Sequence, residues 1–322
     1  MGVLRSEDAN GKMVRFELAA GVHALTGGPM HFDSSVRASE ISIVGNEGTV
    51  IRLPLASERR RLSTDNGAIQ AAIVLSTRLM VQLEGVTFQG DAASLGISAV
   101  VVESGNLEMS NCTVRGVQGA RAIHASGGGA TIRSSLFEAN LAGAIAATSG
   151  SHVLIRDSFL LHNAAENGGA LAVAGGLTEV TAVTTHIAHN SAKAKGGAVH
   201  VENGRVILAL NTLLEHNVAV EGAAMHLSGG STVFALPAPP GRWVNTAVES
   251  EVPTVQPGLR TLVSTVALGS HDEDYPFACP PGTVGGTEIE TQLSPVCVGA
   301  CPAGSVCASA THTPQRAPHI VA

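Results

Sequence analysis

The 322-residue sequence predicts an all-β fold, a right-handed parallel β-helix (a solenoid) followed by a small, disulfide-rich, loop-dominated C-terminal tail. Three observations lead to this prediction. Four asparagines recur at spacings of 23, 27 and 27 residues, apolar and polar residues alternate between them, and glycine interrupts each run. Repeats of this length, built from short strands and turns, are typical of solenoids. The asparagines are Asn140, Asn163, Asn190 and Asn217.

Each repeat contains two strand patterns. Before the asparagine, apolar pairs two residues apart predict one inward strand face, because successive strand side chains point to opposite sides. These pairs are Leu107/Met109, Ala130/Ile132, Val153/Ile155, Val180/Ala182 and Ile207/Ala209. After the glycine a second strand begins, and we expect the residues between its apolar pairs to face outward: His124, Ala146, Ala172, His200 and His226. Helical repeats would need longer runs with a period near 3.6.

Chain connectivity sets the expected hand and the domain limits. Parallel strands joined by crossovers are right-handed in nearly all proteins. Proline after residue 235 ends strand pairing because it lacks an N–H donor, and the single tryptophan, Trp243, is expected to cap the open core end. The expected organisation is a disordered N-terminus (1–13), the β-helix (14–235), a Pro-rich cap and linker (236–276), a cysteine-rich module (277–310) and a disordered tail (311–322).

The asparagines occupy one column of the aligned repeats, which predicts that they lie at equivalent turns with their amides hydrogen-bonded along the stack. Such a ladder satisfies groups that would otherwise be buried without partners. A second polar column is interpreted as another inward ladder: Asn111, Ser134, Asp157, Thr184 and Asn211. Asn111 also begins the one Asn-x-Ser/Thr sequon, Asn111-Cys-Thr113, so an inward side chain predicts that it stays unglycosylated.

Two elements of the repeat resemble a known family. One is Phe137-Glu-Ala-Asn140, and the other is Gly-Gly-Ala followed by an aliphatic residue, at 168–171 and 196–199. They resemble repeats of chlamydial polymorphic outer membrane proteins, which also occur in large surface proteins of unicellular algae and other protists. More broadly, residues 14–235 are similar to the pectin-lyase-like superfamily. The resemblance implies the fold and a surface location, and it carries over no catalytic residue.

The tail has a different chemistry, because cysteine, proline and glycine replace the apolar columns. It has too few apolar side chains for a core, so we expect disulfides, with the pairing open, among Cys279, Cys297, Cys301 and Cys307. Zinc is the alternative, although the Cys-x3-Cys and Cys-x5-Cys spacings fit a paired Cys-x2-Cys site poorly. The tail resembles the small modules of ephrin-receptor-like ectodomains. The fifth cysteine, Cys112, is interpreted as a buried free thiol.

Composition and charge exclude several partners. A net charge of −7 without a basic stripe argues against nucleic acid, and Arg59-Arg60-Arg61 is interpreted as part of a solvated loop. No stretch reaches about 18 apolar residues, so no membrane span is expected in this chain. The tail favours an extracellular or cell-surface location, yet residues 1–12 lack a signal-peptide pattern. We therefore expect a piece of a longer protein, or a start upstream of Met1; the alternative is a cytosolic chain myristoylated at Gly2.

Function follows less directly than fold. We expect a non-catalytic scaffold for adhesion, display or protein interaction, whose partner is a cell-surface protein or glycan, with no cofactor and no metal. The alternative is a polysaccharide lyase or glycoside hydrolase, for which the one candidate trio is Arg133, Arg156 and Asp157. Acid–base cleavage of a sugar linkage needs two carboxylates close together, and the Asp157 column supplies one.

Histidines form two columns in the aligned repeats. His162, His189 and His216 each precede a ladder asparagine, and His200 and His226 form a second column. Histidine ligates metals and titrates near neutral pH, so a metal or pH-sensing site is one interpretation. The simpler interpretation, adopted here, is that these are outward strand-end positions that accept polar residues.

Overall fold

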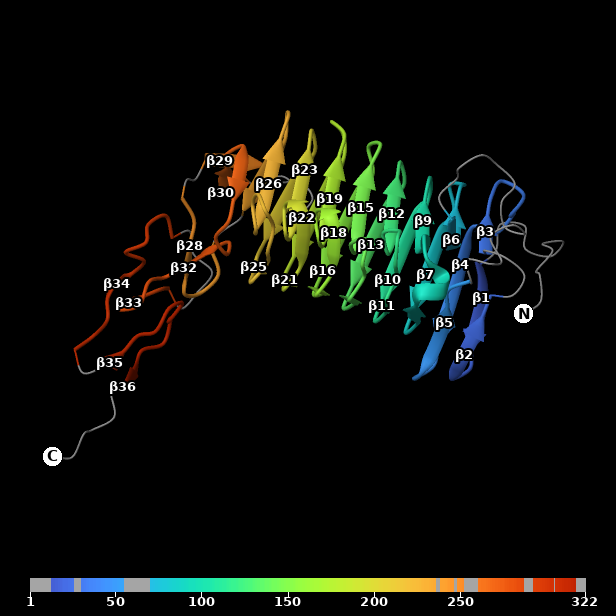
Figure 1. The fold of residues 1–322 in the computed structure, drawn as a ribbon, viewed down its shortest axis with the longest axis horizontal. Coiled ribbons are helices and arrows are strands. Elements are labelled where there is room, and N and C mark those ends of the chain that lie inside the picture. Colours follow the sequence, from blue (N-terminus) through green and yellow to red (C-terminus); the bar gives the residue numbers. More distant parts are fainter. Residues whose placement is uncertain are drawn as a thin grey trace.

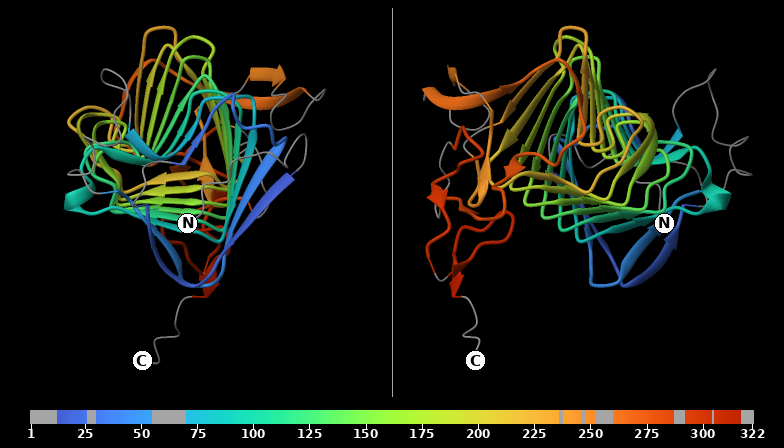
Figure 2. Two further views of the ribbon diagram at one scale, coloured as in Figure 1. Left: turned by 90° about the vertical axis from the view of Figure 1, so that its right-hand side faces the viewer. Right: turned by 60° about the vertical axis from the view of Figure 1, so that its left-hand side comes forward.

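The chain folds into a β-solenoid whose coils are stacked along one axis (Figure 1). The computed structural model describes residues 13–25, 30–54, 70–235, 238–245, 248–251, 260–286, 292–303 and 305–316. Within these residues, eight successive coils each contribute a strand to three parallel sheets, which enclose a three-sided interior (Figure 2). The predicted all-β solenoid is confirmed. The expectations for residues 1–12, for the loop of Arg59-Arg60-Arg61 and for residues 317–322 lie outside the described residues.

Three sheets, named A, B and C, run the length of the stack. Sheet A contains β1 (Met13–Leu18), β4 (Glu40–Gly45), β7 (Met80–Glu84), β10 (Asn106–Ser110), β13 (Gly129–Arg133), β16 (His152–Arg156), β20 (Glu179–Val183), β24 (Arg205–Ala209), β27 (Thr232–Ala235), β30 (Arg260–Val266) and β29 (Val248–Glu251). Sheet B contains β2 (Gly21–Ala24), β5 (Thr49–Arg52), β8 (Thr87–Gln89), β11 (Thr113–Arg115), β14 (Leu136–Glu138), β17 (Phe159–Leu161), β21 (His186–Ala188) and β25 (Leu213–Glu215). Sheet C contains β3 (Met30–Phe32), β6 (Gln70–Leu75), β9 (Ile97–Val102), β12 (Ile123–Ser126), β15 (Ile145–Thr148), β19 (Leu171–Ala174), β23 (Val199–Glu202), β26 (Met225–Ser228) and β31 (Gly269–His271).

Smaller elements complete the described part of the chain. Four strand pairs stand apart from the main sheets: β18 (Ala164–Asn167) with β22 (Ser191–Lys195), β28 (Arg242–Trp243) with β32 (Phe277–Ala278), β33 (Thr283–Val284) with β34 (Gly299–Ala300), and β35 (Ser305–Val306) with β36 (Gln315–Arg316). A 3₁₀ turn, η2 (Ala92–Ser94), is the single helix in these residues. None of the described segments forms a helix long and apolar enough to cross a bilayer.

The interior is filled by the alternating apolar residues of the repeats, with one correction. The sequence predicts Ile207/Ala209 as the inward pair of β24, but Val206 and Leu208 align with the inward pair of β20. The turn after β24 has one residue more than the turn after β20, so alignment from the following asparagine is shifted by one. Ile207 and Ala209 belong instead to a small apolar cluster on the outer face of sheet A.

The four asparagines form a continuous buried ladder at the turn after sheet B. Asn190 illustrates it: Nδ2 donates to Leu160 O at 2.9 Å and to Asn217 Oδ1 at 3.0 Å. Its Oδ1 accepts from the backbone N–H and Nδ2 of Asn163, at 2.9 and 3.0 Å. Asn140 bonds to Asn163 in the same way. Each amide joins two coils and satisfies turn groups that strand pairing leaves free.

A second buried ladder lies at the turn between sheets A and B, one residue later than the sequence predicts. Ser135 Oγ accepts the backbone N–H of Cys112 at 3.2 Å, and Ser158 Oγ accepts that of Ser135 at 3.1 Å. Thr212 Oγ1 accepts the N–H of Thr185 at 3.3 Å. At this turn, side-chain hydroxyls accept backbone N–H groups of the adjacent coil, as the asparagine amides do at the turn after sheet B.

The column predicted to face inward is therefore exposed. Its members adopt left-handed backbone conformations, with φ between 46° and 52°: Asn111, Ser134, Asp157 and Thr184. The extra turn residue removes Asn211 from the column, and Leu210 takes the left-handed position at φ 45°. A left-handed residue reverses the local side-chain direction, so its own side chain points outward and the next one points inward.

Antiparallel strands close the C-terminal end of the stack. β30 pairs with β27 of sheet A, β31 pairs with β26 of sheet C, and Tyr275 bridges to Leu214 at the end of sheet B. The sequence predicts Trp243 over the core end, but Tyr275 fills that place and is 3% exposed. Trp243 lies farther out against Phe277, with ring centroids 4.7 Å apart. The residue that covers the core end, Tyr275, comes about thirty residues later in the chain than Trp243, in the segment that folds back onto the last coil.

An ion cluster ties this cap to the last coil. The Glu215 carboxylate accepts a hydrogen bond from Arg242 and lies 2.7 Å from His186 Nε2, and Arg242 also donates to Pro276 O at 3.0 Å. Burial raises the pKa of the Glu215 carboxyl, but Arg242 and His186 outweigh burial, and the net pKa is lowered. The folded cap therefore favours the ionised carboxylate.

Two disulfides hold the C-terminal module, as predicted, and they give the pairing that the sequence leaves open: Cys279–Cys297 and Cys301–Cys307. The Cys279 N–H donates to Gly241 O at 2.9 Å, which joins the module to the cap. Cys112 is buried and free. Strand β36 reaches Arg316, so ordered pairing continues past residue 310, where the sequence predicts disorder.

Replacing Asn190 with leucine should destabilise the solenoid, because Leu160 O, Asn217 Oδ1 and the Asn163 amide would lose their buried partners. We expect unfolding free energy to fall by on the order of 3 kcal/mol in urea denaturation. Asn211→Leu, at an exposed turn position, is the matched control and should change the midpoint little. Equal midpoints for Asn190→Leu and the parent would contradict the ladder.

Acid should release the cap before it unfolds the coils. A carboxylate with a lowered folded pKa contributes stability above its unfolded pKa, and this is lost as pH falls through the folded pKa, below about 4.5 for Glu215. Trp243 is the single tryptophan and lies beside Arg242, so its fluorescence reports this step. Glu215→Gln should give the released spectrum already at neutral pH, whereas Glu273→Gln should keep the parental pH profile. A parental spectrum from Glu215→Gln would refute the assignment.

Reduction should loosen the tail and leave the coils intact, because closing loops of these lengths contributes roughly 2–4 kcal/mol per bridge and few apolar residues can replace it. Limited proteolysis with and without reductant measures this. We expect cleavage between Cys279 and Cys307 only after reduction. Thiol titration that finds five free cysteines in protein from its native source would instead favour the cytosolic interpretation and the myristoylation pattern at Gly2.

Candidate functional site

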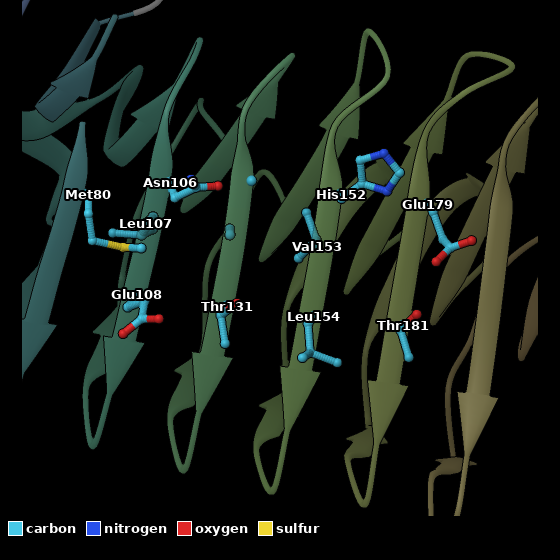
Figure 3. A pocket seen from close by; sticks show the side chains of 12 residues that line it. Met80, Asn106, Leu107, Glu108, Thr131, His152, Val153, Leu154, Glu179 and Thr181 are labelled. Carbon is cyan, nitrogen blue, oxygen red and sulfur yellow. The ribbon is translucent and has the colours of Figure 1, made fainter. Parts of the chain in front are cut away.

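A groove of about 290 Å³ crosses the outer face of sheet A over β7, β10, β13, β16 and β20 (Figure 3). Two rows of residues alternate with the buried core positions and run across the strands. The first row contains Met80, Asn106, Gly129, His152 and Glu179, and the second contains Glu108, Thr131, Leu154 and Thr181. The register of the strands therefore sets the spacing of every side chain in the groove.

Gly129 keeps the middle of the first row open. A Cβ at this position would lie 2.5 Å from Oδ1 of Asn106, so a larger residue would displace the amide. Asn106 and His152 occupy the neighbouring strands in the same register and are both exposed. The Asn106 amide and the His152 imidazole therefore lie on either side of Gly129, which has no side chain to fill the space between them.

Thr181 places an unsatisfied polar group in the groove. The residue is 1% exposed, and its Oγ1 has no hydrogen-bond partner within the described chain. A buried hydroxyl without a partner costs free energy. A group that bonded to this hydroxyl would remove that cost.

The carboxylates of the groove lie apart. Glu108 is on β10 and Glu179 on β20, three strand spacings away, which is roughly 14 Å across the sheet at about 4.8 Å per spacing, and Glu108 is in register with Thr181, two residues after Glu179. Paired catalytic carboxylates of glycoside hydrolases are about 5–10 Å apart. Glu179 also forms an ion pair with Arg205 at 3.3 Å, and the Arg205 guanidinium lies 4.8 Å from the centroid of the Phe234 ring.

The candidate lyase trio lies beside the groove, where the strands of sheet A end. Arg133 and Arg156 are paired in register on β13 and β16. Asp157 follows in the exposed left-handed turn, and its column neighbours Ser134 and Thr184 carry no carboxylate. The structure therefore brings two arginines and one carboxylate to the same edge of the sheet without a second carboxylate in that column.

The first histidine column is a stack of imidazole rings. The ring centroids of His162 and His189 are 5.0 Å apart, and those of His189 and His216 are 5.2 Å apart. All three residues are exposed and have left-handed backbones, the same geometry as the turn between sheets A and B. Among the described residues, no group of three potential ligands is arranged to hold a metal ion.

The second histidine column alternates with inward core residues and therefore points to the outer face of sheet C, as the sequence predicts, but there it is covered rather than exposed. His226 is 6% exposed, its ring centroid lies 5.3 Å from that of His200, and its Nε2 lies 3.5 Å from Glu221 Oε2. Lys195 of β22 lies 3.7 Å from the same carboxylate, so residues near the small β18–β22 sheet approach this outer face of sheet C. Burial lowers the pKa of both imidazoles, which favours their neutral forms.

The sequence pattern does not single out the groove. Its polar residues occupy ordinary outward positions, and the one local signal is Gly129, which stands where neighbouring repeats carry Asn106 and His152. Aligning the strands in register would have placed these three residues in one row. The Thr181 hydroxyl is buried without a partner only in the folded chain, and no local sequence pattern records this.

The comparison with known families agrees with this architecture. A family model described as the right-handed beta helix region matches residues 71–235, more than half of the chain. The chain therefore belongs to the right-handed β-helix family. Searches of curated proteins and of solved structures found no match. The matched span ends with β27, so the antiparallel cap and the disulfide-linked module lie beyond the family region.

Proposed function

We propose that this chain is a non-catalytic, extracellular or cell-surface β-helix scaffold that binds a protein or glycan segment in the sheet A groove, for adhesion or display. The observation that carries the proposal is the groove itself, where hydrogen-bonding side chains from four strands converge and the Thr181 hydroxyl lacks a partner. The two disulfides support an oxidising compartment. The resemblance of the repeats to polymorphic outer membrane proteins, and of the tail to ephrin-receptor-like modules, supports a surface role.

The geometry favours an extended ligand that crosses the strands. Groups in one row of the groove repeat at the strand spacing, about 4.8 Å, so successive units of a polymer can meet successive strands. The row is held by pairing in register on both sides, so little side-chain or backbone order has to be gained on binding. Asn106 and His152 offer hydrogen bonds on one side of the ligand and Glu108 on the other.

A polysaccharide lyase or glycoside hydrolase is the second candidate, and the adjacent Arg133 and Arg156 beside Asp157 favour it. Two arginines on one sheet edge suit an acidic sugar. The test is incubation with polygalacturonate and other acidic polysaccharides, with detection of unsaturated products and of new reducing ends. The scaffold proposal expects neither product. Turnover that is lost in Arg156→Ala would overturn it in favour of the enzyme.

Binding is tested on immobilised panels of oligosaccharides and extended peptides, with the full chain in solution. We expect saturable binding to at least one class, and a Glu108→Gln plus His152→Ala variant should lose it while keeping the parental unfolding midpoint. Saturable binding that survives in this double variant would place the ligand elsewhere. Absence of binding across both panels would contradict the groove as the functional surface.

Thr181→Val should separate binding from stability. Removing an unpartnered buried hydroxyl should leave the unfolding free energy unchanged or raise it by up to about 1 kcal/mol, measured by urea denaturation. Ligand affinity should fall roughly three- to tenfold, the effect of one lost hydrogen bond. Thr87→Val, on the outer face of sheet B, is the control and should leave affinity unchanged. Equal affinity of Thr181→Val and the parent would show that the hydroxyl takes no part in binding.

A further inference from the structure

We propose that Asn111 is a site of N-linked glycosylation, a modification that takes an oligosaccharide from a lipid-diphosphate donor. The proposal rests on the extracellular location inferred above. Asn111-Cys112-Thr113 is the one sequon of the chain. The exposed position of Asn111 in the structure reverses the expectation from the sequence that this asparagine faces inward and stays unmodified.

The turn geometry decides which way Asn111 points. The residue adopts φ 52° between β10 and β11, and its side chain is exposed. The next residue, Cys112, is 2% exposed and occupies the first position of the hydroxyl ladder. The side-chain amide of Asn111 makes no hydrogen bond to another described residue, whereas the amide of Asn163 donates within a buried ladder. Asn111 Nδ2 is therefore available for a covalent bond. The same bond at Asn163 would destroy the buried ladder.

The neighbouring coils leave space for a bulky group. Gly85 occupies the same corner in the preceding coil, with φ 65°, and its N–H donates to Ser110 O at 3.0 Å. Ser134 occupies the corner in the following coil and is exposed. A residue without a side chain and a residue with a short one thus flank Asn111 along the stack. The sequon threonine, Thr113, begins β11 beside this corner and alternates with the buried Val114.

The chain supplies the acceptor amide of Asn111 and the hydroxyl of Thr113 that completes the sequon. Asn111 Nδ2 forms a bond to the anomeric carbon of the first sugar, the bond from that carbon to the lipid-diphosphate oxygen breaks, and the diphosphate leaves with the electron pair. One Nδ2 proton is lost to a base. The same compartment supplies the oxidising conditions that the tail disulfides need. The free Cys112 thiol donates weakly to Ser110 O and Leu83 O inside the coil.

The test expresses the full chain behind a cleavable secretion signal in a eukaryotic secretory host. Glycopeptides are identified by mass spectrometry in the folded, protease-resistant fraction from both medium and cells, so poor secretion does not obscure the result. We expect an oligosaccharide on Asn111 that is removed by amidase, retained in Thr113→Ser and lost in Thr113→Ala. Enzymatic removal of the sugar should leave the unfolding midpoint of the coils unchanged.

A geometric contrast uses a second sequon at a buried position. Ala165→Thr creates one at Asn163, and molecules glycosylated there should be absent from the folded fraction because their ladder cannot form. A folded chain with both disulfides and an unmodified Asn111 would overturn the proposal, as would glycan confined to aggregated material. Glycosylated protein that fails to bind in the groove would leave this site standing and contradict the proposed function alone.

Discussion

Two buried polar ladders, one of asparagine amides and one of hydroxyls, hold the corners of the coils, and the rest of the solenoid depends on them. Strands of three to six residues contain too few backbone hydrogen bonds to fix their own register. A slip of one residue would exchange the core face for the solvent face. At each corner a left-handed residue points outward, and the next residue accepts a backbone N–H from the adjacent coil, as Ser135 does from Cys112. This contact locks coil to coil at the position where strand pairing stops.

The two ladders differ in how far the sequence predicts them. The asparagine ladder follows from the pattern because asparagine recurs in all four repeats, whereas the residue before it changes from Ala139 in the first to histidine in the other three. At the other corner two polar residues stand side by side, as in Ser134-Ser135 and Thr184-Thr185, and either could face inward. The left-handed backbone decides between them, and it depends on the path of the whole coil. In the turn after β24 there is one extra residue, so an alignment of this repeat on its asparagine places the strand residues one position off.

Other features depend on parts of the chain that are distant in sequence. The core end is covered by Tyr275, which bridges to Leu214 across about sixty residues of chain, so a search limited to the first aromatic residue after the coils selects Trp243 instead. His226 is covered because Glu221 lies over an outer face that alternation marks as exposed. The rows of the groove follow from alternation once the register is known. Glu108 and Glu179 are three strand spacings apart, too far to act as a catalytic carboxylate pair. This separation is known only once the order and register of the strands are known.

The reversal of strand direction at the C-terminal end has a consequence for assembly. A parallel stack can in principle grow by adding coils of another molecule in the same sense, and a head-to-tail contact of this kind propagates into a filament. Here β30 and β31 run against β27 and β26, and Tyr275 occupies the edge of sheet B. The face that a second solenoid would have to meet is already filled by strands of the opposite sense. At this end of the stack, the described strands therefore leave no parallel edge to which a coil of a second molecule could be added in the same sense.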